Sequence, residues 1–147
     1  MNVFFAAETL IGIIEEKGLL SLNRSPLAMG LLTGKYSAAG APLRDDIRAG
    51  NHHWLDYFKD GRVVPAYSRR LDAIRDLLRA DGRTLSQGAL AWLWARSPVT
   101  IPLPGFRTVA QVEENAGALQ KGPLSSEIMA EIERAVMREP EGEPRER

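Results

Sequence analysis

The sequence of 147 residues contains no cysteine and only two histidines, the adjacent His52 and His53. Without cysteine the chain forms no disulfide and has no thiolate chemistry, and a histidine pair with no cysteine or His-x-x-x-His partner does not match the spacing of a zinc site. The neighbours Asn51, Trp54 and Asp56 are typical of a polar loop. We therefore expect the two histidines to be surface residues rather than an acid–base pair, and we expect no metal.

An excess of charge of either sign is also missing, because 19 basic residues balance 19 acidic ones. No stretch gathers Lys and Arg into a basic stripe, so nucleic acid is not an expected partner. No segment approaches the roughly 20 apolar residues that span a bilayer, so no membrane is expected. The apolar start of the chain reaches Glu8 too early for a secretory signal, which predicts a cytoplasmic protein. The hydrophobic content of 44% is enough for one folded core.

Apolar periodicity predicts five helices and two strands. The helices are expected at residues 8–17, 65–80, 84–97, 108–118 and from 125 onward, and the strands at 19–23 and 99–103. The segment 36–63 shows no steady period, so we expect a long irregular excursion with at most one short helix. One domain is expected over 1–138, and the polar tail 139–147, which has no apolar residue, is expected to be disordered.

The starts of three helices carry capping signals. Thr84 with Gln87 and Thr108 with Gln111 have the spacing of the capping box, in which the threonine hydroxyl and the glutamine side chain each satisfy an amide of the first turn. A further helix is expected to start at Ser125, with its flanking apolar residues at the spacing of a hydrophobic staple.

The two predicted strands are of the parallel type. Residues 19–23 are short, apolar and bounded by Gly18 and Pro26, as expected of a strand buried on both faces. In the second strand, Pro102 indicates a strand end or a bulge. Because α/β folds bind ligands with the loops that follow parallel strands, the segments 25–35 and 101–115 are the candidate ligand loops.

The second of these loops suits an anionic group such as a phosphate. Gly105 allows a close backbone approach, Arg107 offers a planar cation, and the helix that opens at Thr108 presents free amides. One turn later Glu114 and Asn115 follow Gln111 on roughly the same face, where they could reach an adenine edge and ribose hydroxyls. The alternative is an ordinary turn, a solvated arginine and the wet face of an amphipathic helix.

In the first loop, Ser25 offers a hydroxyl, the backbone of residues 27–30 could cradle a pyrophosphate, and Lys35 adds a point charge. The alternative is a glycine-rich connector that follows a buried strand. Neither loop decides between these alternatives by itself.

Taken together, residues 23–36 (NRSPLAMGLLTGKY) and 104–115 (PGFRTVAQVEEN), with TLSQGALAWL at 84–93 between them, resemble the aldo-keto reductase superfamily, especially its bacterial and potassium-channel-β-subunit-like branch. The resemblance implies an α/β fold, the C-terminal part of a (β/α)₈ TIM barrel, that binds NADP(H) for the reduction of aldehydes or ketones, with a partial oxidoreductase domain over 1–138. Ser25, Leu27 and Lys35 would then line the pyrophosphate, and Gly105, Arg107, Gln111, Glu114 and Asn115 the adenosine end. The full set of implied cofactor-binding residues is Arg24, Ser25, Pro26, Leu27, Met29, Gly30, Lys35, Gly105, Phe106, Arg107, Gln111, Glu114 and Asn115.

The chain departs from the family pattern in two ways. Arg24 stands where many members place an aromatic residue that stacks on nicotinamide, so a cation would lie beside that ring. The family's catalytic Asp, Tyr, Lys and His lie on early strands that this sequence does not contain, so we assign no catalytic residue here and expect a truncated, incomplete barrel of about two parallel strands.

Such a remnant would expose strand edges and the helix faces meant to cover a larger sheet. We therefore expect self-association or a complementary chain, and a cofactor-binding portion that is inactive alone. The alternative is a non-enzymatic interaction or nucleotide-binding module that pairs with another chain.

Overall fold

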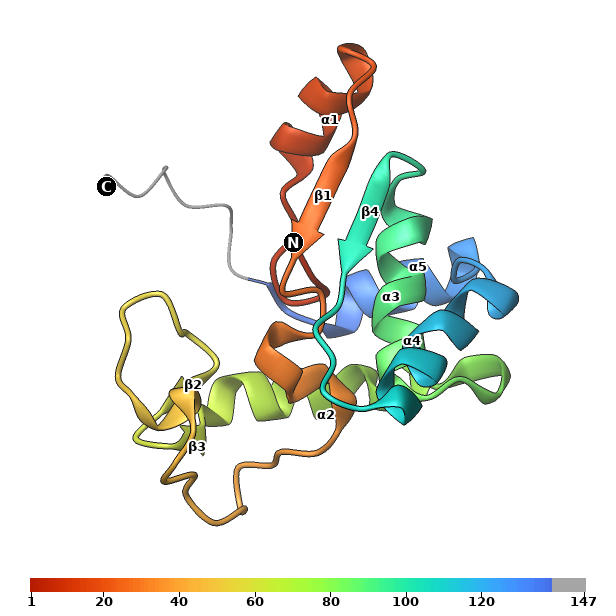
Figure 1. Ribbon diagram of the computed structural model, residues 1–147. Helices are drawn as coiled ribbons and strands as arrows, with labels where there is room; N and C mark the ends of the chain where they lie inside the picture. Colours follow the sequence, from red (N-terminus) through yellow and green to blue (C-terminus); the bar gives the residue numbers. More distant parts are fainter. Residues whose placement is uncertain (139–147) are drawn as a thin grey trace.

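The computed structural model of the chain describes residues 1–138 and has an α/β fold (Figure 1). The predicted tail at 139–147 lies outside the described residues. In chain order the helices and strands, including the short 3₁₀ helices labelled η, are α1 (Glu8–Glu16), β1 (Ser21–Arg24), η1 (Ala28–Thr33), η2 (Ile47–Ala49), β2 (Phe58–Lys59), β3 (Arg62–Val63), α2 (Pro65–Leu78), η3 (Ala80–Gly82), α3 (Leu85–Arg96), β4 (Thr100–Leu103), α4 (Val109–Lys121) and α5 (Ser126–Ala135).

The two predicted strands pair in parallel, which confirms the predicted strand type. Ser21 of β1 lies opposite Thr100 of β4, and Arg24 opposite Leu103, so the strands end level with each other. The loops that follow them therefore leave the same edge of the sheet side by side (Figure 1). Within residues 1–138 each of these two strands has a neighbour on one side only, so they do not close into a barrel.

All five predicted helices are present, and side-chain caps mark the starts of α3, α4 and α5. The Thr84 hydroxyl accepts from the amide of Gln87 while the Gln87 side chain accepts from the amide of Thr84, which is the predicted capping box. At α4 only half of the predicted box forms, because the Gln111 side chain reaches back one residue further and accepts from the amide of Arg107 at 2.7 Å. The Ser125 hydroxyl caps α5.

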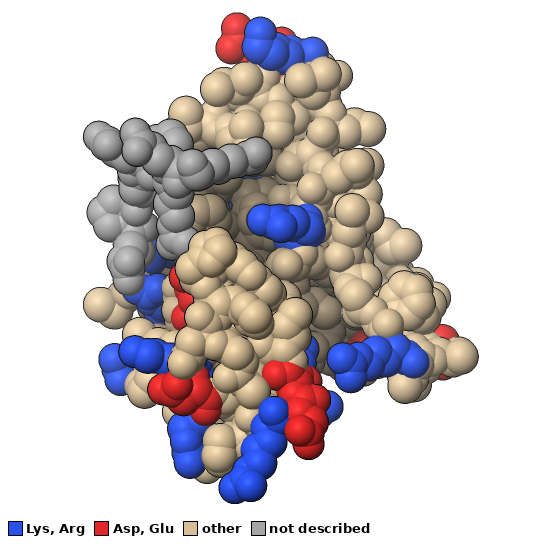
Figure 2. Space-filling model, turned by 60° about the vertical axis from the view of Figure 1, so that its left-hand side comes forward, with Lys and Arg blue, Asp and Glu red and all other residues tan. Residues whose placement is uncertain are grey.

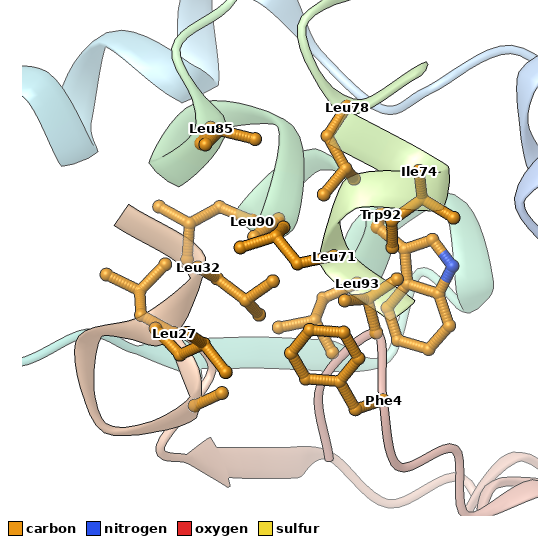
Figure 3. Packing of buried hydrophobic residues seen from close by; sticks show 14 of the residues in the cluster. Phe4, Leu27, Leu32, Leu71, Ile74, Leu78, Leu85, Leu90, Trp92 and Leu93 are labelled. Atoms are coloured by element: carbon orange, nitrogen blue, oxygen red, sulfur yellow. The ribbon is translucent and has the colours of Figure 1, made fainter. Parts of the chain in front are cut away.

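The core lies between η1, α2, α3 and α5 rather than on both faces of the sheet. Figure 3 shows Leu32 of η1, Leu71 of α2 and Leu90 of α3 converging on one another, with Trp92 beside Ile74. Every residue of α3 from Leu85 to Leu93 is buried except Gln87. Helix α3 is thus the central element, and the loops that follow β1 and β4 are positioned against it.

The excursion 36–63 contains one short helix, η2, as predicted, and also a hairpin that we did not predict. Strands β2 and β3 pair antiparallel through the two-residue turn Asp60–Gly61, and both turn residues have positive φ, at 50° and 71°. An Asp-Gly pair is the preferred sequence for this type I′ turn, so the signal was present in the sequence.

The prediction that β1 is buried on both faces is wrong. Leu20 and Leu22 are 65% and 66% exposed, and Leu10 and Ile13 of α1 are exposed as well. The cause is the missing neighbour: a β1 paired only with β4 has no second strand or covering layer within the described chain. In Figure 2 the described surface in the upper part of the view is mostly free of Lys, Arg, Asp and Glu, apart from a group of charged side chains at its very top. In the lower part, basic and acidic side chains are intermixed.

Candidate functional site

The loops that follow β1 and β4 enclose one pocket with a cavity volume of about 440 Å³. Twelve of the thirteen residues proposed from the sequence line it; the exception is Arg24, an exposed residue at the end of β1. Five further residues were not foreseen. The whole lining comprises Ser25, Pro26, Leu27, Met29, Gly30, Thr33, Lys35, Tyr36, Asp46, Arg48, Ser86, Gly105, Phe106, Arg107, Gln111, Glu114 and Asn115.

The first wall of the pocket is built from backbone in an unusual conformation. Ser25, Ala28 and Met29 all have positive φ, between 49° and 55°, although none of them is glycine. Such residues each cost about 1–3 kcal/mol and persist only where the surrounding structure holds them, often at ligand sites. The amides of Ala28 and Gly30 already donate to the carbonyls of Ser25 and Leu27. This wall is therefore a tight double turn rather than an open loop.

The N-terminal segment holds this wall in place from outside the pocket. The buried Asn2 donates to the Ser25 carbonyl at 3.3 Å and to the Tyr57 hydroxyl at 2.9 Å. Burial raises the pKa of the Tyr57 hydroxyl, so this group stays protonated at neutral pH. Asn2 thus ties the start of the first loop to the excursion.

Lys35 is positioned by its own turn. The Thr33 hydroxyl donates to the Gly30 carbonyl at 2.7 Å and accepts from the amide of Lys35, which fixes the chain as it leaves η1. The Lys35 ammonium then lies 5.5 Å from the centre of the Tyr36 ring. Within residues 1–138 the Lys35 side chain makes no ion pair, so its charge is directed at the pocket and the solvent.

Arg48 and Asp46 come from the excursion and close the lower side of the pocket. The Arg48 guanidinium donates to the Met29 carbonyl at 2.6 Å and to both Asp46 oxygens at 2.7 and 2.8 Å, and lies 4.9 Å from the Tyr36 ring centre. The Arg48 amide hydrogen bond, followed by its guanidinium and the charge of Arg107, holds the pKa of Asp46 below its usual value. The pocket therefore contains a carboxylate that is ionised at neutral pH beside its cations.

The opposite wall is the start of α4. The Gln111 side chain accepts from the backbone amide of Arg107, and Thr108 caps the helix, so the backbone of Arg107 is fixed directly before the free amides of the first turn. Arg107 makes no ion pair within the described chain, although its charge acts on Asp46. This wall places a cation and a helix N-terminus at the same point, which favours an anion.

The middle of α4 is held against α3 by a hydrogen bond. The Gln87 side chain donates to the Glu114 carbonyl at 3.1 Å, and the next residue back along α3, Ser86, lines the pocket although it is only 2% exposed. Sequence patterns gave no signal for Ser86 or Arg48, because a helical serine and a loop arginine are ordinary residues in those contexts. Their role depends on segments brought together by the fold.

The two histidines lie away from the pocket. His52 and His53 are exposed, as predicted, and the His52 ring stacks on Trp54. Among residues 1–138 no three His, Asp or Glu side chains are grouped as a metal would require. None of the described helices is long and apolar enough to cross a membrane.

The pocket has the chemistry of a binding site for an extended anionic ligand. Lys35, Arg107 and the α4 N-terminus supply positive potential, while Gln111, Glu114 and Asn115 offer donors and acceptors for a polar ring or sugar.

Residues 1–137 match the family model described as "Aldo/keto reductase family". The chloroplastic pyridoxal reductase of Arabidopsis thaliana is 34% identical over 73% of this chain and 26% of its own length. "Aldo-keto reductase yakc [NADP(+)]" of Schizosaccharomyces pombe is 31% identical over 85% of this chain and 36% of its own length. Among solved structures, aldo-keto reductase AKR11C1 from Bacillus halodurans matches in its apo and holo forms with a TM-score of 0.64 at 23% identity, over 96% of this chain and 44% and 43% of those chains. The chain thus spans less than half the length of these relatives.

Proposed function

We propose that this chain, which belongs to the aldo/keto reductase family, is the NADP(H)-binding portion of a reductase that acts on aldehydes or ketones, and that it is catalytically silent alone. The observation that carries the proposal is the joining of two loops, at residues 25–36 and 105–115, around one pocket with cations and helix amides at one end. An accidental turn and a solvated helix face would have no reason to meet in this way.

The residues present fit a nicotinamide dinucleotide phosphate. Arg107 and the first amides of α4 suit the ribose 2′-phosphate, because a guanidinium binds a phosphate through two parallel hydrogen bonds. Lys35 and the double turn at residues 25–30 suit the pyrophosphate, and Gln111, Glu114 and Asn115 suit the adenosine. A cavity of about 440 Å³ holds part of such a ligand, and the open side accounts for the remainder.

The expected lack of catalytic activity follows from what carbonyl reduction needs besides cofactor binding. A bound NADPH supplies the hydride, but a general acid must protonate the carbonyl oxygen. The family resemblance places that acid on early strands, which this sequence does not contain. We therefore expect the 147-residue chain to bind NADPH without oxidising it when an aldehyde is added.

The test is a fluorescence titration of the full chain with NADPH and with NADH, for the natural sequence and for Arg107→Ala. The variant should bind NADPH at least about tenfold more weakly, since it loses charge-assisted hydrogen bonds, and should no longer prefer NADPH over NADH. Arg69→Ala is the control, because Arg69 is an exposed arginine of α2 outside the pocket. Unchanged affinity in Arg107→Ala would remove the basis of the cofactor assignment, and aldehyde-dependent NADPH oxidation would refute silence.

A second candidate function is pairing with another chain, and the apolar surface of β1 favours it. Leu20 and Leu22 are more exposed than leucines of a finished sheet, and both strands keep an unpaired edge in the described chain. A complementary polypeptide that supplies the first six strands of a reductase barrel would cover this surface. Aldehyde-dependent NADPH oxidation by the mixture, absent from either part alone, is the result that this candidate requires.

A further inference from the structure

Asn2 is a buried residue that does not line the cavity but is bonded to its first wall. It is 3% exposed. Its side-chain amide donates to the Ser25 carbonyl at 3.3 Å and to the Tyr57 hydroxyl at 2.9 Å, and its side-chain oxygen accepts from the amide of Phe4 at 3.0 Å. An asparagine side chain has two N–H donors, so both are in use. Asn2 therefore joins the N-terminal segment, the first loop and the excursion at one point outside the cavity.

The position of the Asn2 side chain is set by the core rather than by the loop. The backbone of Asn2 exchanges two hydrogen bonds with Phe5, at 3.1 and 2.9 Å. Phe4 is 4% exposed, and its ring centre lies 5.6 Å from that of Tyr67 and 6.2 Å from that of Tyr57. The two tyrosine rings also contact each other, with 5.0 Å between their centres. The Asn2 amide is thus a fixed group against which the first loop is positioned.

The carbonyl that Asn2 binds belongs to the first residue of the double turn with an unfavourable backbone conformation. Ser25 and Met29 both have positive φ, of 54° and 55°. Residues other than glycine persist in this conformation where the surrounding structure holds them. The Met29 carbonyl is held at 2.6 Å by Arg48, which lines the cavity. The Ser25 carbonyl is held by Asn2, which does not line it, and a return of Ser25 to negative φ would rotate this carbonyl and break the bond.

We infer that Asn2 is a positioning residue for the diphosphate of the bound dinucleotide. The inference rests on the proposed function, in which the double turn at residues 25–30 and Lys35 receive this group. The Ser25 carbonyl also accepts from the amide of Ala28 at 3.0 Å, the bond that closes the first turn. By fixing this carbonyl, Asn2 fixes the turn without touching the ligand. When only part of the population has the binding conformation, the apparent affinity falls by that fraction, so loss of Asn2 should weaken binding of the diphosphate.

The test compares the full natural chain with Asn2→Ala by isothermal titration of two probes. The first, 2′-phospho-ADP-ribose, contains the diphosphate, whereas the second, 2′-AMP, contains only the adenosine end with its 2′-phosphate. We expect the variant to bind 2′-phospho-ADP-ribose about three- to tenfold more weakly, the range of one neutral hydrogen bond. Its affinity for 2′-AMP should equal that of the natural chain, which a general loss of structure would not allow.

Two further variants separate the effect on the turn from a defect in folding. Tyr57→Phe keeps the ring that packs on Phe4 and removes only the hydroxyl, so we expect a loss of about two- to threefold, again confined to 2′-phospho-ADP-ribose. Asn51→Ala is the matched control, because the Asn51 side chain makes two comparable bonds to Asp60, at 2.6 and 2.9 Å, outside the cavity. It should bind both probes as the natural chain does. Thermal midpoints show which proteins are folded at the titration temperature.

Three outcomes overturn the inference. Unchanged affinity of Asn2→Ala for 2′-phospho-ADP-ribose would show that the turn keeps its conformation without Asn2; if this variant does not fold, unchanged affinity of Tyr57→Phe decides in the same way. An equal loss for both probes would show that Asn2 supports the whole fold and not the turn. These two outcomes leave the proposed function intact. A natural chain that binds neither probe nor NADPH would refute the proposed function itself, and the inference with it.

Discussion

Gly88 in the middle of α3 is the residue at which local preference and tertiary packing make opposite predictions. By helix propensity alone, Gly88→Ala should stabilise the protein by about 1 kcal/mol. In the structure, however, a Cβ at residue 88 would lie 1.9 Å from the Leu78 carbonyl oxygen and 2.7 Å from its carbon. These are backbone atoms at the end of α2, which cannot swing aside as a flexible side chain could. The two helices cross at this glycine because it has no side chain.

We expect the cost of the steric clash to exceed the gain in helix propensity, so that Gly88→Ala lowers the free energy of unfolding. To reach an ordinary contact, the oxygen would have to move by more than about 1 Å, which separates α2 from α3 around the buried Leu78. Overpacking of a core costs about 1–3 kcal/mol, and a fixed backbone places this site at or above the upper end. After the propensity gain is subtracted, we expect a net destabilisation of at least about 2 kcal/mol. For a chain of this length the thermal midpoint should fall by roughly 4–8 °C or more.

The assay is unfolding by heat and by urea, followed by circular dichroism, with Gly12→Ala as the matched control. Gly12 lies inside α1, and a Cβ there would have no atom within 4 Å. The control should therefore gain the propensity term, and the two variants should move in opposite directions. A thermal midpoint for Gly88→Ala equal to or above that of the natural chain would refute the reasoning from the Leu78 contact.

Three further predictions concern charge and exposure. The amide and then the guanidinium of Arg48 hold the pKa of Asp46 below its usual value, so the stability that these contacts contribute is present above about pH 4 and is lost as the pH falls through the lowered pKa. Between about pH 5 and 3 the thermal midpoint of Asp46→Asn should therefore fall less than the thermal midpoint of the natural chain. An identical fall in both proteins would contradict this. Arg138→Ala should lower the free energy of unfolding in urea by about 2 kcal/mol. The reason is that the Arg138 guanidinium is ion-paired with Glu133, donates to the Val3 carbonyl at 2.8 Å and lies 5.1 Å from the Trp92 ring centre. If Arg138→Lys had the same free energy of unfolding as the natural chain, the planar contacts of the guanidinium would not be the cause. Leu22→Lys should reduce self-association in sedimentation velocity with the circular dichroism unchanged, since it places a charge on the exposed strand; unaltered association would locate the contact elsewhere.

The features that the sequence predicted well are those that neighbouring residues determine. The capping box of Thr84 and Gln87 needs four consecutive residues, and it formed as expected. The pairing of β1 with β4 followed from two short apolar segments with ligand-type loops after them. Asp60–Gly61 belongs to the same class, because its turn preference is local, and the hairpin could have been predicted from it.

The features that were missed depend on distant partners. The burial of Leu22 is decided by whether a second strand adjoins β1, which no local pattern contains. Arg48 enters the cavity because its guanidinium meets the Met29 carbonyl nineteen residues away. The positive φ at Ala28 and Met29 was equally hidden, since glycine would be the usual residue for that conformation and the surrounding core imposes it here.

The two walls of the cavity are held in position by helices of this chain rather than by a closed sheet. Leu31 and Leu32 of η1 are fully buried in the core around α3. The C-terminal end of α4 is fixed by the buried Arg83, whose guanidinium donates to the Lys121 carbonyl at 2.8 Å, and the middle of α4 by the bond from Gln87 to Glu114. These contacts do not involve the open edges of β1 and β4, so the described walls of the cavity hold their positions without a further strand. On the proposed function, the 147-residue chain is therefore expected to bind NADPH although it does not reduce a carbonyl, and its affinity for NADPH tests the first property without the second.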